Sequence, residues 1–141
     1  MNKNKIVGYT TGVYDLFHIG HLKILQKAKS NCDFLIVGVS NDELVSYKYK
    51  KAIIPFSDRI EIVKNIKCVD MVVEQKSMDK MEAWKKLDFN KMFVGDDWKG
   101  TEKWLQYEKE FSAVGVEIVY FPYTKGVSST LINNTLRNLR I

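Results

Sequence analysis

Residues 10–21 read Thr-Thr-Gly-Val-Tyr-Asp-Leu-Phe-His-Ile-Gly-His, and a short apolar run, residues 6–9, precedes them. Residues 22–28 follow with apolar side chains at helical spacing. This order predicts a strand, a loop that contains glycine, and a helix that begins near His18. The first turn of a helix has unpaired N–H groups and the positive end of the helix dipole, so it favours a bound anion. We therefore expect this loop to hold the phosphates of a nucleotide.

Apolar segments alternate with helical patterns along the rest of the chain. Residues 34–39 are continuously apolar, which is typical of a strand covered by helices on both faces. Alternating strands and helices predict a parallel sheet with right-handed crossovers. We expect an α/β fold: one doubly wound, Rossmann-like domain over residues 1–141, with a five-stranded parallel sheet and helices on both faces. The expected strands are residues 5–10, 33–40, 70–74, 91–95 and 116–121, and the expected helices are residues 19–30, 57–66, 79–87, 101–113 and 131–139.

Polar segments follow four of the expected strands, and residues 47–51 among them read as a basic, mobile loop. In doubly wound sheets the ligand lies at the carboxyl ends of the strands. The polar segments after the first, second, fourth and fifth strands should therefore meet at one edge of the sheet, where we expect the functional site.

The composition limits the classes of function. The chain has 141 residues and a net charge of +5, which suits an anionic partner, either nucleic acid or a small polyanion such as a nucleoside triphosphate. No apolar run reaches the length that spans a membrane, and no apolar targeting segment follows the first residues. We expect a cytoplasmic protein that does not act on membranes. The two cysteines, Cys32 and Cys68, have no metal-binding spacing.

His18 and His21 are three residues apart, so they lie on one face of the expected helix. Three roles are open: a metal pair, structural histidines at a helix start, or donors to a phosphate. A metal site would need a third ligand, and the sequence offers no obvious one. Gly20 lies between the two histidines and allows a bulky ligand to approach the backbone, which supports the phosphate role.

Residues 11–15 followed by residues 18–21 resemble the nucleotide-binding signature of the cytidylyltransferases, a family of nucleotidyltransferases. The chain is most similar to the small bacterial glycerol-3-phosphate cytidylyltransferases, from about residue 6 to residue 136. Further segments carry the same resemblance: Lys48 and Lys50, Arg59, residues 95–98 and residues 124–130.

The resemblance implies that a phosphate oxygen of a small phosphorylated alcohol attacks the α-phosphorus of CTP, with Mg²⁺ accompanying the triphosphate. Glycerol 3-phosphate is the favoured acceptor, and CDP-glycerol for cell-wall, teichoic acid or capsule polymers is the product. Phosphocholine, phosphoethanolamine or another sugar or alcohol phosphate as acceptor, and ATP as donor, remain alternatives. So does a nucleotide- or RNA-binding protein without catalysis, although no known RNA-binding module is recognisable. The resemblance also implies a homodimer that binds no nucleic acid.

The resemblance assigns roles to individual residues, and simpler explanations stand beside several of them. The Lys48 region reads alone as a solvated loop, Arg59 as a helix-surface charge, and residues 96–98 as a turn. Catalysis is assigned to His18, His21, Lys48 and Arg59. Substrate binding is assigned to Lys48, Lys80 and Trp98, and no residue is assigned to a metal. Nucleotide binding is assigned to Gly12, Val13, Tyr14, Asp15, His18, Gly20, His21, Lys50, Asp96, Asp97, Thr124, Gly126, Val127, Ser128, Ser129 and Thr130.

Three positions depart from the family pattern. Val13 replaces a threonine, Tyr123 replaces an arginine, and Lys125 replaces a glutamate. The arginine is a bidentate phosphate ligand, and Lys125 is a candidate to replace it in part. These departures keep the alternative acceptors and donors open.

Overall fold

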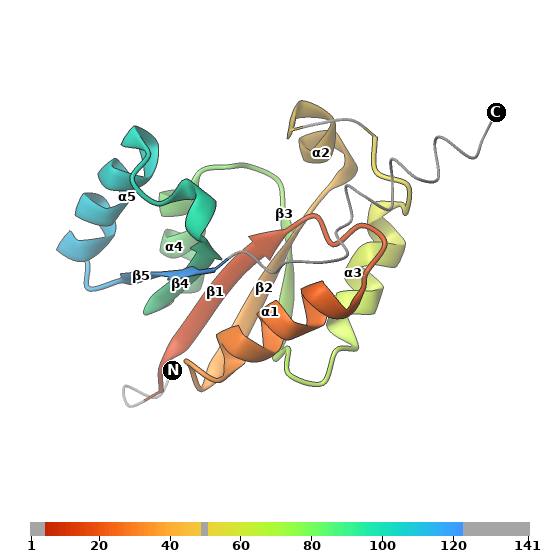
Figure 1. The fold of residues 1–141 in the computed structure, drawn as a ribbon, viewed down its shortest axis with the longest axis horizontal. Helices are drawn as coiled ribbons and strands as arrows, with labels where there is room; N and C mark the ends of the chain where they lie inside the picture. Colours follow the sequence, from red (N-terminus) through yellow and green to blue (C-terminus); the bar gives the residue numbers. More distant parts are fainter. Residues whose placement is uncertain (1–4, 49–50, 123–141) are drawn as a thin grey trace.

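The computed structural model describes residues 5–48 and 51–122 and confirms the expected parallel α/β sheet (Figure 1). Five strands lie in the order β3-β2-β1-β4-β5, and every neighbouring pair is parallel. The elements, in chain order, are β1 (Val7–Gly12), α1 (Ile19–Lys29), β2 (Phe34–Ser40), α2 (Asp42–Lys48), α3 (Phe56–Lys64), β3 (Met71–Gln75), α4 (Lys80–Leu87), β4 (Lys91–Gly95), a 3₁₀ turn (Asp96–Trp98), α5 (Glu102–Ala113) and β5 (Glu117–Phe121).

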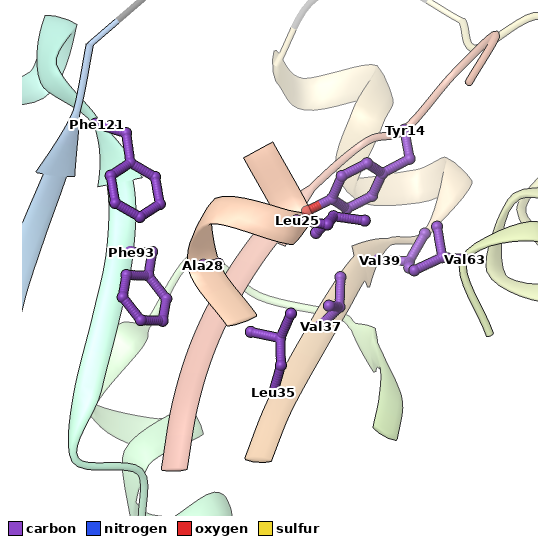
Figure 2. Close-up of a cluster of buried hydrophobic side chains, with 9 residues drawn as sticks. All are labelled: Tyr14, Leu25, Ala28, Leu35, Val37, Val39, Val63, Phe93 and Phe121. Atoms are coloured by element: carbon purple, nitrogen blue, oxygen red, sulfur yellow. The ribbon is translucent and has the colours of Figure 1, made fainter. Parts of the chain in front are cut away.

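Helices cover both faces of the sheet. On one face, Leu25 and Ala28 of α1 pack over Leu35 and Val37 of β2, and α3 adds Val63 (Figure 2). On the other face, α5 packs Trp104 and Phe111 against Val7, Tyr9, Ile36 and Met92, and α4 adds partly buried side chains. Successive side chains of β2 therefore point into different cores, as expected for a strand buried on both faces.

The sequence located the regular elements to within about two residues, with one correction. Residues 47–51 were expected to form a loop, but Tyr47 and Lys48 belong to the last turn of α2. Asn41 caps this helix, because its Oδ1 accepts a hydrogen bond from the Leu44 N–H. The expected last helix, residues 131–139, lies outside the described residues. Within the described ranges, none of the helices has the length and apolar character needed to cross a bilayer.

Candidate active site

The candidate site lies where the direction of the crossovers changes. β1 is the central strand, with β2 on one side and β4 on the other, so the carboxyl ends of β1 and β4 form the switch point of the sheet. Gly12 ends β1 and Gly95 ends β4. The polar segments after β1, β2 and β4 meet at this edge, as the sequence predicts, and the start of α4 after β3 joins them.

The loop from β1 to α1 is strained. Tyr14 and Leu16 have left-handed backbones, with φ of 55° and 51°, which non-glycine residues rarely adopt. Such residues cost about 1–3 kcal/mol each and persist only where their surroundings fix them. The Tyr14 ring is buried in the core and lies edge-on to His21, with 5.6 Å between ring centroids. Any contact of Tyr14 with a nucleotide therefore falls to its backbone.

His18 and His21 close the first turn of α1 by capping each other. The Gly20 N–H donates to Nδ1 of His18 at 3.0 Å, and the His18 N–H donates to Nδ1 of His21 at 3.1 Å. A ring nitrogen that accepts an N–H carries no proton, so in both neutral rings the proton is on Nε2. The helix cap thus fixes both imidazoles as Nε2–H donors.

The two imidazoles lie together, with ring centroids 4.1 Å apart. Burial lowers the pKa of His21 from 6.5 to about 4; the charge of His18 acts in the same direction, and Asp15 opposes it. His21 is therefore neutral at pH 7. Nε2 of His18 is buried and has no hydrogen-bond partner among the described residues. A buried donor in this position is explained by a ligand oxygen, since nearly all such groups are paired.

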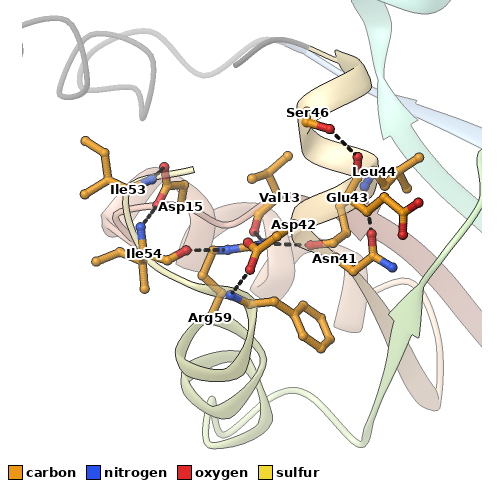
Figure 3. Close-up of polar contacts among 12 residues, drawn as sticks. Val13, Asp15, Asn41, Asp42, Glu43, Leu44, Ser46, Ile53, Ile54 and Arg59 are labelled. Atoms are coloured by element: carbon orange, nitrogen blue, oxygen red, sulfur yellow. Dashed lines mark hydrogen bonds and ion pairs between the residues drawn. The ribbon is translucent and has the colours of Figure 1, made fainter. Parts of the chain in front are cut away.

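Asp15 connects the histidine loop to residues 53 and 54, which follow the basic residues 47–51. Its Oδ2 accepts from the Ile53 N–H and its Oδ1 from the Ile54 N–H, both at 2.9 Å (Figure 3). The carboxylate is buried. Both of its oxygens are thus engaged with backbone, and Asp15 acts on the site by holding residues 51–54 beside the histidine loop.

Arg59 is not placed as the simpler explanation expected. Its side chain is fully buried, so it is not a helix-surface charge. The guanidinium donates to the carbonyls of Ile54, Val13 and Ser40 at 2.7–2.8 Å. It also pairs with Oδ1 of Asp42 at 2.7 Å (Figure 3). In this arrangement Arg59 holds three loops together at the strand ends, and its assigned catalytic role stays a prediction.

A cavity of about 390 Å³ opens next to the histidine loop. We call it the α5 pocket, because α5 forms one wall. Lys80 and Trp98, both predicted substrate residues, line it, as do Gly12 and Val13. Asp97 lies beside it, because its Oδ1 would be 2.7 Å from a Cβ placed on Gly95. The full lining is Thr11, Gly12, Val13, Met78, Lys80, Met92, Phe93, Val94, Gly95, Trp98, Lys103, Trp104 and Tyr107.

Several predicted residues cannot be placed in this geometry. Lys48 lies in the last turn of α2 and not in the expected loop. Lys50 lies outside the described residues, as do Thr124, Gly126, Val127, Ser128, Ser129 and Thr130 and the family departures Tyr123 and Lys125.

The structure adds site residues that the sequence reasoning missed. Asp42 pairs with Arg59, and its place at the start of a helix after β2 is the signal that could have found it. Lys103, Trp104 and Tyr107 line the α5 pocket. Among the described residues, no group of three His, Cys, Asp or Glu side chains is arranged to hold a metal ion.

The chain is similar to several known proteins. A family model described as cytidylyltransferase-like matches residues 9–135. The chain is 38% identical to the glycerol-3-phosphate cytidylyltransferase of Bacillus spizizenii over 96% of this chain and 98% of that protein. It is 36% identical to the FAD synthase of Korarchaeum cryptofilum over 89% of this chain and 88% of that protein. The solved structure of the lipopolysaccharide core biosynthesis protein of Thermoplasma volcanium is similar, with a TM-score of 0.72 and 25% identity, over 87% of this chain and 99% of that one.

Proposed function

Since this chain belongs to the cytidylyltransferase-like family, we propose that it transfers the cytidylyl group of CTP to glycerol 3-phosphate, which forms CDP-glycerol and releases pyrophosphate. The observation that carries the proposal is the similarity to a glycerol-3-phosphate cytidylyltransferase over nearly the whole of both chains. The buried Nε2 of His18, at the start of α1 and at the switch point of the sheet, supports it.

In the proposed reaction, a phosphate oxygen of glycerol 3-phosphate forms a bond to the α-phosphorus of CTP as the bond to the pyrophosphate oxygen breaks. The protein forms no covalent bond with the substrates. Its contribution is to position them and to stabilise the charge that builds on the phosphates. His18 and His21 donate from Nε2 to these oxygens, with the amino end of α1 behind them.

The remaining predicted residues extend this site in the proposal. Lys48 binds the acceptor phosphate, Lys50 the nucleotide, and residues 124–130 the CTP phosphates. The exposed carboxylates of Asp96 and Asp97, which directly follow β4, would hold Mg²⁺ together with the triphosphate, and the ion would neutralise part of the phosphate charge. One or two such ligands suit an ion that keeps most of its coordination to phosphate and water.

The test is pyrophosphate release from purified protein with CTP and glycerol 3-phosphate. We expect turnover, and we expect His18→Ala and His21→Ala each to reduce kcat by about a hundredfold or more, because each removes a donor to the developing charge. A variant that kept near-normal turnover would remove that histidine from the mechanism. Light scattering on the same sample measures the expected homodimer.

ATP as donor is the second candidate, because FAD synthases also match most of the chain. The same assay distinguishes it when CTP and ATP are compared, with glycerol 3-phosphate and with FMN as acceptors. Turnover with ATP and none with CTP would overturn the proposed function.

A further inference from the structure

The charged side chains that line the α5 pocket are positive. Of the lining residues, Lys80 and Lys103 are cationic, and none of the described ones is a carboxylate. Lys80 is only 5% exposed, and its Nζ lies 3.3 Å from Thr11 Oγ1. Lys103 is exposed on α5 at the pocket wall. Asp97 lies next to the pocket, over Gly95, but is not part of its lining.

The walls of the pocket are held in place by contacts between elements. Asp79 caps α4, because its Oδ1 accepts from the Met81 and Glu82 N–H groups at 3.1 Å, and this fixes the start of the helix that carries Lys80. The Tyr107 hydroxyl donates to the Met78 carbonyl at 3.4 Å, which joins α5 to the segment before α4.

The pocket also has aromatic walls. Trp104 lies edge-on to Tyr107, with 5.1 Å between ring centroids, and Trp98 lines the opening. Aromatic walls alone would suit a quaternary ammonium group. The two lysines in the same cavity make a cationic ligand unfavourable, because they repel it. Their own ammonium groups donate hydrogen bonds, so they favour a ligand with hydroxyl or anionic oxygens.

The pocket adjoins the loop that is proposed to hold the reacting phosphates, through Gly12 and Val13. Resting on the proposed function, we propose that the α5 pocket holds the alcohol part of the acceptor and that Lys103, together with Lys80, selects against acceptors with a cationic head group. Uncharged polyol phosphates are accepted, whereas phosphocholine and phosphoethanolamine are rejected. Lys103 is thus a specificity-determining residue supplied by α5.

The experiment compares glycerol 3-phosphate, phosphoethanolamine and phosphocholine as acceptors at saturating CTP. The wild type and Lys103→Glu are measured, with Lys109→Glu as a matched control, since Lys109 is an exposed lysine of α5 that does not line the pocket. We expect the wild type to prefer glycerol 3-phosphate over phosphoethanolamine and phosphocholine by about a hundredfold in kcat/KM. Lys103→Glu should raise the KM for glycerol 3-phosphate about tenfold, and the ratio of kcat/KM between glycerol 3-phosphate and the cationic acceptors should become smaller. The KM for CTP and the Lys109→Glu values should remain those of the wild type.

Two results would overturn the inference while leaving the proposed function standing. One is a wild type that uses phosphocholine as well as glycerol 3-phosphate. The other is a Lys103→Glu variant whose acceptor preference equals that of Lys109→Glu. A wild type that uses none of the three acceptors with CTP contradicts the proposed function itself, and the inference fails with it.

Discussion

His21 is kept neutral by its surroundings, and this makes the stability of the protein depend on pH. Its pKa is lowered from 6.5 to about 4, first by burial and then by the charge of His18. Between these two pH values the unfolded chain binds a proton at His21 that the folded chain does not. His21 therefore leaves the free energy of unfolding unchanged above pH 6.5, and this free energy decreases as the pH falls toward 4.

We predict that His21→Asn removes this part of the pH dependence. The asparagine Oδ1 takes the place of Nδ1 and keeps an acceptor for the His18 N–H, so the cap is retained. The measurement is the free energy of unfolding in urea for both proteins across about pH 7.5 to 4.5. The wild type should lose more stability than the variant over this range. Equal losses would show that folded His21 takes up its proton at the ordinary pKa.

Arg59 gives a second prediction for a single residue. Its guanidinium is fully buried, donates hydrogen bonds to three carbonyls and pairs with the Asp42 carboxylate. Arg59→Met keeps an unbranched side chain but leaves these acceptors unpaired, so we expect a loss of about 3–5 kcal/mol in the free energy of unfolding. Lys64→Met, at an exposed site of the same helix, is the control and should change it by less than about 0.5 kcal/mol. Similar costs for the two variants would contradict this account of Arg59.

The contacts of Arg59 could not be read from the sequence, and neither could the two backbone groups that Asp15 binds. Both sets of contacts join segments 17 to 46 residues apart, so they depend on how the strands and loops are arranged. The histidine loop was different, because Gly20, His18 and His21 make their contacts within one helical turn. The start of the helix near His18 was therefore predictable from local sequence, and the network around it was not.

At the scale of elements, Asp15 connects the histidine loop with the segment that follows α2. Asp15→Asn keeps the volume but replaces one acceptor oxygen with an amide donor, which then faces a backbone N–H of Ile53 or Ile54. We predict faster amide hydrogen exchange at these two residues. We also predict a fall of about tenfold or more in kcat/KM, because small displacements of positioning groups are costly in catalysis.

Asp33→Asn is a suitable control for this change. The Asp33 carboxylate also accepts a backbone N–H, from Ile6 at 2.8 Å, but it does so before β2, at the opposite edge of the sheet. Its substitution should leave kcat/KM near the wild-type value. If both variants lost activity equally, the loss would reflect general destabilisation and not the position of residues 51–54.

The elements were predicted where apolar pattern and turn chemistry agreed. β2 and β4 follow from apolar runs, and the helix predicted over residues 79–87 matches α4. The extension of α2 through Lys48 was missed, because the basic composition of residues 47–51 suggested a loop. Buried Leu44 and Val45 anchor that helix, and their burial depends on the neighbouring strands rather than on a repeating pattern.

At the scale of the whole molecule, the alternation of strands and helices was enough to predict the edge of the sheet where the candidate site residues meet. It did not predict that α5 would wall a pocket. Trp104 and Tyr107 lie on the face of α5 that packs toward the sheet, and both also line the cavity, so one face of the helix contributes to the core and to the cavity wall. The sequence pattern predicts which face of the helix is apolar, but it does not predict the cavity beside that face.

The packing of the central strand gives the last prediction. Gly8 lies in β1, paired with Leu35 of β2 and Lys91 of β4. A Cβ at this position would meet Phe93 Cε2 at 2.5 Å and Cys32 Sγ at 2.8 Å. Gly8→Ala should therefore lower the free energy of unfolding by about 1–3 kcal/mol, the usual cost of overpacking a core.

A double-mutant cycle with Phe93→Leu separates this clash from other effects of the added methyl group. The smaller leucine leaves room beside β1, so the double variant should be more stable than the sum of the two single changes predicts. Urea unfolding of the four proteins gives the coupling energy. Gly8 lies near the amino end of β1, away from the histidine loop, so the folded Gly8→Ala protein should keep its kcat. Strict additivity would mean that the sheet moves to accept the methyl group, and that the central strand is less tightly confined than its contacts indicate.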